Sequence, residues 1–278
     1  MSERGPVTPQ ERLAELDQLA ATVATEAAEV VMAGYRTRPV ADEKGRRDLV
    51  TEFDRASEAL ILERLRAHEP DIEVVAEEGS RHRQGSNSPL VWYVDPLDGT
   101  TNFVHGHPFW CVAIGLAETT RSRGGKQEQP VVGAVVAPAL QLTWRAHGAG
   151  PATRNGQPCQ LSETASLAHS LVATGFPPLR DHVPDNNFDS FMQVKQKSQA
   201  VRRCGSAAID LCMVADGTYE GFWERRLHVW DTVAGAAILL AAGGKVTSLT
   251  GQTPDYHVGH VVASNGFIHD ELVATVGA

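Results

Sequence analysis

The stretch WYVDPLDGTTNF, residues 92–103, joins an apolar run to two aspartates and a Gly-Thr-Thr segment. The apolar residues before Asp95 predict a buried strand that ends at this aspartate. Pro96 fixes φ at about −65°, so the chain turns and presents Asp95, the carbonyl group of Leu97 and Asp98 on one side. The Gly-Thr-Thr segment then predicts the start of a short helix. A strand end and a helix start that meet in this way are typical of ligand sites in layered proteins that mix helices and strands.

Two carboxylates held so close together repel each other, so one of them must bind a proton or both must share a cation. The free N–H groups of the helix that follows favour an anion beside such a cation. The segment therefore fits a metal ion that links carboxylates to a phosphate group. A simpler alternative stays open, in which Asp98 only caps the helix and Asp95 only stabilises a turn.

Further acidic residues occupy similar positions. Glu77 and Glu78 directly follow the apolar run IEVVA, Asp231 begins an apolar helix, and Asp54 lies between an extended piece and a helix. Asp54 or Asp231 alone could be an exposed helix cap, but several acids at element ends indicate a ligand site. Carboxylates with a backbone carbonyl suit Mg²⁺ or Mn²⁺, and the absence of clustered cysteines or paired histidines argues against zinc.

Other polar residues are expected to be structural. His105, His107 and His228 lie near the acidic segments, and we expect them to pack or to support ligands rather than to bind metal. Ser206 is expected to cap the helix that follows it, since no His and Asp partners are in register to make it a nucleophile. The four widely spaced cysteines are expected to be reduced thiols, most of them buried.

The order of elements predicts a layered fold. Hairpin turns are expected in residues 141–159, and the polar segment 121–130 is predicted to be a turn between two strands. Frequent hairpins among mixed helices and strands favour a layered α+β or α/β sandwich over a barrel of strict repeats. One domain of residues 1–278 is expected, with a soft boundary between lobes near residues 140–150. Helices are predicted over residues 8–35, 55–69, 186–200, 206–217, 230–244 and the C-terminus, and strands over residues 72–78, 90–96, 109–118, 131–140, 169–176, 200–204, 219–224 and 261–265.

Composition narrows the range of functions. The chain has 278 residues, 42% of them hydrophobic, which is enough to bury a large core, and its formal net charge is −9. An acidic surface argues against nonspecific binding to nucleic acid or to anionic membranes. The polar N-terminal segment does not look like a signal peptide, and no apolar run approaches the roughly 18 residues of a membrane span. These features predict a soluble, cytoplasmic protein.

The motif DPLDGTTNF, with the Glu77-Glu78 pair upstream and WDTVAGAAILLAAGG downstream, closely resembles the inositol monophosphatase family of Mg²⁺-dependent, lithium-sensitive phosphatases. The segments DLVTEFDRASE, VRRCGSAAIDL and GFWERRLHVWD extend the resemblance over most of the chain. The resemblance implies a layered αβαβα sandwich of the inositol monophosphatase and fructose-1,6-bisphosphatase type. It also implies a homodimer and two to three bound Mg²⁺ ions.

By the family pattern, Glu77, Asp95 and the carbonyl group of Leu97 would hold one metal ion. Asp95, Asp98 and Asp231 would hold the second, so that Asp95 bridges the two ions. A third, more weakly bound ion is expected near Glu77, mostly through water. With metal ions in these places, the phosphate oxygens would be neutralised and a bound water would become the nucleophile.

The resemblance also assigns catalytic and substrate contacts. Thr100, hydrogen-bonded to Asp54, would orient the attacking water, with Glu77 as a further contact to it. The start of the helix after Cys204 and the acid Glu224 would meet the hydroxyl groups of the alcohol, although Glu224 could also be a surface acid paired with a neighbouring arginine. The implied substrate-binding residues are Asp98, Gly99, Thr100, Thr101, Gly205, Ser206, Ala207 and Glu224.

The chain departs from the family pattern at two positions. Lys44 plausibly corresponds to a lysine of the family, but it is one residue too close to Asp48, so we do not include it in the predicted site. Ala241 stands where the family usually has a glutamate, which removes a possible supporting contact.

The expected reaction is hydrolysis of inositol 1-phosphate. The Glu224 segment and the GTTNFVHGHPFW match favour this small phosphorylated polyol. The same metal site in relatives also serves histidinol phosphate, fructose 1,6-bisphosphate and 3′-phosphoadenosine 5′-phosphate, so these stay as alternatives. A regulatory or RNA-associated protein with incidental activity is a further alternative. Its support is limited to three arginine pairs, Arg46-Arg47, Arg202-Arg203 and Arg225-Arg226, which we expect to be solvated surface charges.

Overall fold

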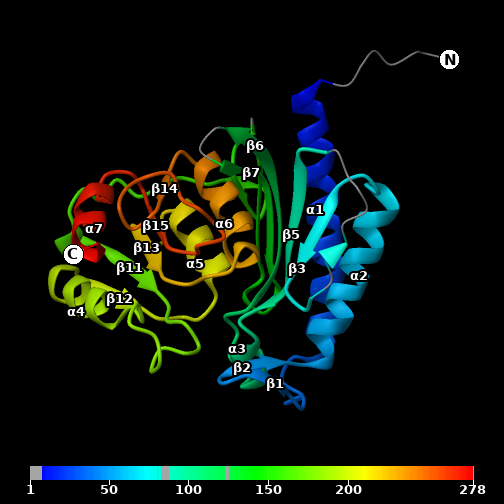
Figure 1. Ribbon diagram of the computed structural model, residues 1–278, viewed down its shortest axis with the longest axis horizontal. Coiled ribbons are helices and arrows are strands. Elements are labelled where there is room, and N and C mark those ends of the chain that lie inside the picture. Colours follow the sequence, from blue (N-terminus) through cyan, green and yellow to red (C-terminus); the bar gives the residue numbers. More distant parts are fainter. Residues whose placement is uncertain (1–7, 80, 83–87, 123–124, 149, 278) are drawn as a thin grey trace.

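Five layers of helices and sheets stack in this protein (Figure 1). The computed structural model describes residues 8–79, 81–82, 88–122, 125–148 and 150–277. From one side to the other, the layers are a helix pair, a large sheet, a second helix pair, a smaller sheet and a third helix pair (Figure 1). This arrangement confirms the predicted αβαβα sandwich.

The large sheet has eight strands in the order β10-β9-β8-β7-β6-β5-β3-β4. Neighbouring strands are antiparallel except β3 and β5, which run parallel. Its long central strands carry buried aliphatic and aromatic residues, as the apolar runs predicted. The strands are β3 (Glu73–Ala76), β4 (Arg81–His82), β5 (Leu90–Asp98), β6 (Cys111–Ser122), β7 (Gly125–Ala137), β8 (Leu142–His147), β9 (Thr153–Arg154) and β10 (Gln157–Pro158).

The smaller sheet has five strands in the order β12-β11-β13-β15-β14. Strand β11 runs parallel to β12 and β13, whereas β15 is antiparallel to its two neighbours. A separate antiparallel hairpin, β1 (Asp42–Gly45) and β2 (Asp48–Val50), lies at one end of the large sheet beside helix α3 (Thr100–Val104) (Figure 1). The strands of the smaller sheet are β11 (Leu171–Thr174), β12 (Ala200–Arg202), β13 (Gly221–Glu224), β14 (Lys245–Thr247) and β15 (Val261–Ser264).

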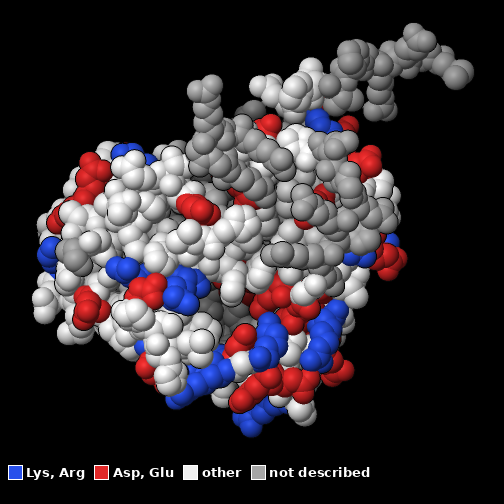
Figure 2. Space-filling view, in the orientation of Figure 1, with Lys and Arg blue, Asp and Glu red and all other residues white. Residues whose placement is uncertain are grey.

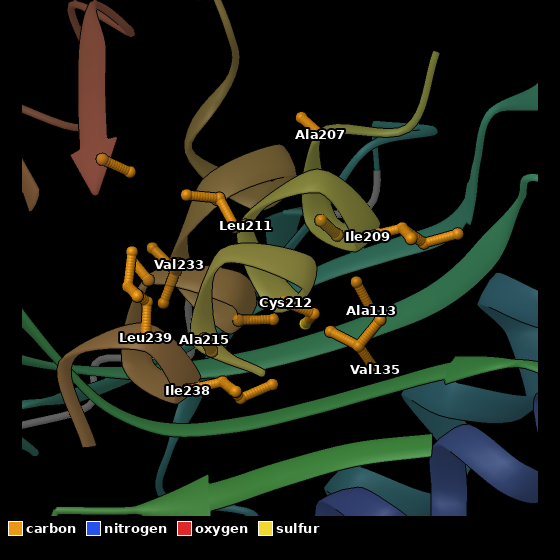
Figure 3. Close-up of a cluster of buried hydrophobic side chains, with 14 of the residues drawn as sticks. Ala113, Val135, Ala207, Ile209, Leu211, Cys212, Ala215, Val233, Ile238 and Leu239 are labelled. Carbon is orange, nitrogen blue, oxygen red and sulfur yellow. The ribbon is translucent and has the colours of Figure 1, made fainter. Parts of the chain in front are cut away.

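Three helix pairs cover the sheets. Helices α1 (Pro9–Gly34) and α2 (Glu52–His68) pack on the outer face of the large sheet, and α4 (Phe188–Lys197) and α7 (His269–Val276) pack on the outer face of the smaller one. Helices α5 (Ala207–Ala215) and α6 (Val229–Ala241) are buried between the two sheets. Figure 3 shows Cys212 of α5 beside Ala113 and Val135 of the large sheet. Because both helices bury apolar side chains on all sides, they hold the two sheets together.

Several boundaries differ from the prediction, and three of the differences are informative. Helix α2 begins at Glu52 rather than residue 55, because Thr51 and Asp54 form a capping box that starts the helix earlier. Strand β5 continues to Asp98, with an irregular register between Asp95 and Asp98, rather than ending at Asp95. Most of the expected turn at residues 121–130 is strand, and the part at residues 123–124 lies outside the described residues.

Predictions on the cysteines, the hairpin turn and the short strands were confirmed only in part. The four cysteines are free, two of them buried and two partly buried, and the Asn155-Gly156 turn joins β9 to β10 as expected. The short strand β14 was not predicted. None of the described helices has the length and apolarity that crossing a membrane requires. The soft lobe boundary near residues 140–150 stays a prediction.

Candidate active site

The irregular end of β5 places three oxygen donors at one location. The backbone N–H group of Leu97 donates to Asp95 Oδ1 at 3.0 Å, which holds this carboxylate against the bulge. Ser57 of α2 donates to the carbonyl oxygen of Pro96 at 2.8 Å, so the turn is also fixed from behind. Gly99 then takes a left-handed conformation, with φ of 91°, and begins helix α3. The sequence DPLDG therefore forms a rigid corner between sheet and helix.

The predicted metal ligands surround one small cavity. Its volume is about 150 Å³, and it opens where strand and helix ends from both halves of the chain meet. Figure 2 shows a hollow on the lower part of this face, with acidic and basic side chains gathered around it. The lining residues that the sequence predicted are Glu77, Asp95, Leu97, Asp98, Gly99, Thr100, Gly205, Ser206, Ala207, Glu224 and Asp231.

Asp54 and Thr100 form the predicted pair. The Thr100 hydroxyl group lies 2.9 Å from Asp54 Oδ1 and 3.1 Å from the carbonyl oxygen of Leu97, so it has two acceptors for its one proton. The other oxygen of Asp54 accepts from the backbone N–H group and the hydroxyl group of Thr51, at 2.8 and 2.5 Å. Asp54 is 0% exposed, so it is a buried anchor behind Thr100 and not the exposed cap that the alternative required.

Asp98 connects the two halves of the site. Its Oδ2 accepts hydrogen bonds from the Ser206 hydroxyl group at 2.7 Å and from the backbone N–H group of Ala208 at 2.9 Å, both at the start of α5. Ser206 also accepts from the N–H group of Ile209, which confirms it as the cap of α5. The alternative in which Asp98 caps the helix that directly follows it is wrong, because Gly99 starts that helix without a side-chain cap.

Asp231 enters the cavity from the start of α6. Its Oδ2 accepts from the backbone N–H group of His228 at 2.7 Å, so Asp231 caps its own helix and also lines the cavity. Ala241, the position where the family usually has a glutamate, is the last residue of the same helix. Ten residues of helix separate the two positions by about 15 Å, so the change at Ala241 lies far from the cavity.

Burial and mutual repulsion raise the pKa values of these acids. Burial raises the pKa of Asp95 well above its usual value, and the charges of Glu77, Asp98 and Asp231 raise it further. Burial also raises the pKa of Asp98 to about 6, although the hydrogen bonds from Ser206 and Ala208 oppose this shift. The pKa of Asp231 is raised well above its usual value, first by burial and then by Asp98. Carboxylates in this state favour a proton or a shared cation.

Lys44 supplies a cation to one side of this cluster. Its ammonium group lies 2.7 Å from Glu77 Oε1 and 2.9 Å from Glu78 Oε1. Burial raises the pKa of Glu77 to about 7, and Lys44 acts against this rise. Lys44 lies at the irregular point of the β1–β2 register, between Glu43 and Gly45. Its spacing from Asp48 kept Lys44 out of the predicted site, but the structure places it in contact with Glu77, a residue of that site.

The oxygen atoms that line the small cavity are of the kind that binds a divalent cation. In this structure, however, the side chains are not oriented to bind one together. Within the described residues, no three or more His, Cys, Asp or Glu side chains are placed to hold a metal ion together. Lys44 already holds Glu77, and Asp98 Oδ2 is engaged by α5. Nevertheless the cavity is lined by carboxylate and carbonyl oxygens, the donors that Mg²⁺ prefers. Burial, and then the charges of neighbouring acids, raise the pKa of Asp95 among them. Metal binding therefore requires small rotations of these side chains.

Glu224 lies in the cavity as expected, whereas Thr101 does not. Glu224 is 9% exposed and lines the cavity, and its neighbours Arg225 and Arg226 bond elsewhere, so it is not a paired surface acid. Burial raises its pKa to about 8. Thr101 is exposed and lines a larger adjoining cavity rather than the small one.

The prediction also missed Arg203. It was assigned as a solvated charge, and although its side chain is exposed, it lines both cavities. The only signal in the sequence was its position two residues before Gly205.

Comparisons with known proteins agree with this fold. An inositol-1-monophosphatase of Synechocystis sp. is 45% identical over 237 residues, which cover 85% of this chain and 79% of that protein. The Nus factor SuhB of Pseudomonas aeruginosa is 36% identical, with 84% of this chain and 85% of that protein covered. The structure of an inositol monophosphatase from Anabaena (Nostoc) sp. superimposes with a TM-score of 0.84 and 37% identity, covering 95% and 96% of the two chains.

Fold and comparisons together define a layered α+β protein of the phosphatase class. More specifically, the chain belongs to the inositol monophosphatase family, whose sequence model matches residues 12–278. This is a family of metal-dependent phosphatases that act on small phosphorylated substrates.

Proposed function

We propose that the protein hydrolyses the phosphate monoester of a small polyol, with inositol 1-phosphate as substrate and Mg²⁺ as cofactor. One observation carries the proposal: the Thr100–Asp54 hydrogen bond lies at the edge of a small cavity lined by Glu77, Asp95, Asp98 and Asp231. A polarised hydroxyl group beside carboxylates that need cations is the arrangement that metal-assisted attack of water requires.

Thr100 and Asp54 orient the nucleophile. Asp54 is fixed by Thr51, so it can accept the hydrogen bond from the Thr100 hydroxyl group without moving. The Thr100 oxygen then keeps a lone pair that can accept a hydrogen bond from water. Glu77, on the same cavity, provides a second acceptor for that water once it is released from Lys44. The two acceptors together would orient the water toward the phosphorus atom of a bound substrate.

Glu77, Asp95, the carbonyl group of Leu97, Asp98 and Asp231 would hold two to three Mg²⁺ ions. Bound there, the ions would neutralise phosphate oxygens, lower the pKa of water and stabilise the leaving alkoxide. The phosphate group would lie against the N–H groups of the Gly99 to Thr101 segment, beside these ligands.

The alcohol part of the substrate would lie on the opposite wall. The start of α5, from Gly205 to Ala207, presents backbone and hydroxyl groups to the cavity, and Asp98 is bonded to it. Glu224 also lines this cavity, and burial raises its pKa to about 8, so at neutral pH its carboxyl group can both donate a hydrogen bond to a polyol and accept one from it. These groups support recognition of a hydroxyl-rich alcohol.

The test is phosphate release with Mg²⁺ from inositol 1-phosphate, histidinol phosphate, fructose 1,6-bisphosphate and 3′-phosphoadenosine 5′-phosphate, each repeated in EDTA. We expect inositol 1-phosphate to give the highest kcat/KM and EDTA to abolish release. A large margin in favour of another ester would reject the substrate, and activity in EDTA would reject the metal.

Asp98→Asn tests the site itself. We expect kcat to fall at least about 10³-fold with the fold preserved, because the variant removes a charge that the cations need. An undiminished Mg²⁺-dependent rate would contradict the assignment of Asp98. One relative is named as the Nus factor SuhB, and this name suggests a regulatory role as an alternative function. If this chain has such a role, Asp98→Asn should leave its cellular function intact.

Three finer properties stay predictions. Lithium inhibition is checked by titrating LiCl into the assay. A homodimer is checked by the mass in analytical ultracentrifugation. A cytoplasmic location is checked by cell fractionation.

A further inference from the structure

A buried asparagine at the start of α4 connects the ends of two strands of the smaller sheet. Asn187 is 3% exposed, and its side-chain N–H groups donate to the carbonyl oxygen of Gly175 at 2.7 Å and to the Thr174 hydroxyl group at 2.8 Å. Its side-chain oxygen accepts from the indole N–H group of Trp223 at 2.8 Å. Thr174 is the last residue of β11, and Trp223 is the last but one of β13. One side chain therefore holds the ends of both strands.

The conformation of Asn187 fits this role. Its backbone is left-handed, with φ of 77°, which asparagine adopts more readily than most residues, although at a cost in free energy. Asparagine at the start of a helix commonly caps it, yet this side chain makes no capping hydrogen bond to α4. The amide group is therefore used to hold the strands rather than its own helix.

Glu224 directly follows Trp223 and projects from the opposite face of the strand, because neighbouring residues of a strand alternate between its faces. Trp223 is held on the outer face of the sheet by Asn187, and Arg225 donates to the Ser190 hydroxyl group of the same helix at 3.0 Å. Glu224 lies between these two anchors and lines the small cavity. The start of α4 thus fixes the strand end that carries Glu224.

Gly175 leaves the space that the carboxyl group of Glu224 occupies. A Cβ atom placed on Gly175 would lie 2.1 and 2.2 Å from the two carboxyl oxygens. The carboxyl group therefore packs directly against the backbone that follows β11, and its position depends on the spacing of β11 and β13. Thr174 also donates to the carbonyl oxygen of Trp223 at 2.5 Å, so Thr174 and Asn187 set this spacing together.

We propose that Asn187 is a positioning residue that makes the site selective for a hydroxyl-rich alcohol, because it holds Glu224 in place to contact the hydroxyl groups. This inference rests on the proposed function and adds a residue behind the wall that recognises the alcohol. Asn187 lies on the outer face of the smaller sheet, so it acts through Glu224 and not by touching the substrate. The proposed metal ligands Asp95, Asp98 and Asp231 belong to β5 and α6, outside this network. The effect should therefore fall on the alcohol rather than on the phosphate group.

The experiment compares Asn187→Gly with the intact protein, because glycine adopts the left-handed conformation easily and has no side chain. Inositol 1-phosphate is paired with phenyl phosphate, a phosphate monoester whose ring carries no hydroxyl groups. With Mg²⁺, we expect the variant to raise KM for inositol 1-phosphate at least about 10-fold and to change kcat less than about threefold. For phenyl phosphate, kcat/KM should change less than about twofold. Equal losses with both esters would contradict the proposal, since a general loss of structure does not discriminate between them.

Asn187→Asp is a second variant that nearly keeps the shape of the side chain. It can still accept from Trp223 but loses both donors, so it should raise the same KM, and it serves as the test if the glycine variant does not fold. Unchanged KM values in a folded variant of either kind would overturn the proposal.

A double variant shows whether Asn187 acts through Glu224. In Glu224→Ala, the carboxyl group that Asn187 positions is absent. Adding Asn187→Gly to that variant should then lower kcat/KM for inositol 1-phosphate less than about twofold further. An additional loss as large as in the intact protein would mean that Asn187 acts by another route, and the proposal would be wrong.

Asn186→Ala is the matched control. The side-chain oxygen of Asn186 accepts from the backbone N–H group of Phe188 at 3.1 Å, so this variant disturbs the start of α4 without removing the bonds of Asn187. The ratio of kcat/KM between the two esters should stay that of the intact protein. A ratio changed as much as in Asn187→Gly would show that any disturbance of α4 has this effect, and the proposal would be wrong.

The same measurements separate this inference from the proposed function. If the intact protein hydrolyses neither ester with Mg²⁺, or if Glu224→Ala leaves the ratio between them unchanged, the proposed function fails and this inference fails with it. If both of these results are as expected and the Asn187 variants have no effect on the ratio, this inference alone fails.

Discussion

A single hydroxyl group at Thr100 connects the buried Asp54 to the proposed water. Thr100→Val removes this group with little change in shape, so the water loses one acceptor and Asp54 loses one donor. We expect kcat to fall about 10²-fold or more while KM changes little. The melting temperature should also fall slightly, because a buried carboxylate is left with fewer partners.

Thr100→Ser is the matched control for this prediction. It keeps the hydroxyl group and its two acceptors, so it should restore most of the kcat that the valine variant loses. Steady-state kinetics with inositol 1-phosphate would measure both. Equal rates for the two variants would show that the hydroxyl group does not orient the nucleophile.

At the scale of residues, the sequence predicted the acids better than the bases. Asp95, Asp98 and Asp231 follow or begin apolar elements, and this local pattern is enough to indicate that they face a ligand. Lys44 reaches the site from the irregular part of strand β1, and Arg203 reaches it from the loop that follows β12. The Lys44 contact to Glu77 spans 33 residues of chain. Such positions depend on how distant segments pack, which no local pattern specifies.

At the scale of elements, α6 approaches the large sheet unusually closely at two glycines. A Cβ atom on Gly133 of β7 would lie 2.2 Å from the carbonyl oxygen of Ala234, and one on Gly115 of β6 would lie 2.6 Å from the backbone nitrogen of the same residue. Both obstacles are helix backbone, which cannot rotate away as a side chain can. Gly133→Ala therefore has to displace α6, which carries Asp231 at its start.

We expect Gly133→Ala to destabilise the protein by about 3 kcal/mol, which lowers the melting temperature by roughly 6–12 °C. The Mg²⁺ concentration for half-maximal activity should also rise, because Asp231 moves with the helix. Gly148→Ala is the control, since its Cβ would meet only ordinary contacts at 3.6 and 3.7 Å. A melting temperature unchanged in Gly133→Ala would contradict the close packing of α6.

The exact ends of helices and strands depend on side-chain hydrogen bonds and bulges, which the periodic pattern of apolar residues does not reveal. Helix α2 starts at Glu52 because Thr51 and Asp54 bond to each other, and the same Asp54 also serves Thr100. Strand β5 continues past Pro96 because a bulge lets the ladder resume at Asp98, opposite Cys111. In both cases the residues that shift the boundary are those that build the candidate site.

At the scale of the whole molecule, the layers could be predicted but the strand order could not. Mixed helices, strands and hairpins favour a layered sandwich, and the resemblance specified five layers. The pairing of β11 with β13, or of β13 with β15, joins strands that other elements separate in the sequence. Such pairings arise from the global packing of apolar faces around α5 and α6.

The acids buried between these layers make the stability of the metal-free protein depend on pH. The pKa of Glu224 is about 8 in the folded protein, raised by burial from 4.5. Between these pH values the folded state keeps a proton that the unfolded state has lost. The free energy of unfolding therefore falls as pH rises from about 4.5 to 8, and the penalty is complete above that range.

Glu224→Gln removes this dependence, because glutamine stays neutral at every pH. In EDTA, the variant and the intact protein should have similar melting temperatures near pH 5, and the variant should become more stable by about 5 °C or more near pH 8.5. Glu63→Gln, which changes an exposed acid on α2, should show no such widening gap. Added Mg²⁺ should narrow the gap at high pH, since cations in the cavity offset the charge of Glu224 as well as that of the neighbouring aspartates. A constant difference between pH 5 and pH 8.5 would mean that Glu224 is already ionised in the folded protein, and its contact with a polyol would then be through a carboxylate.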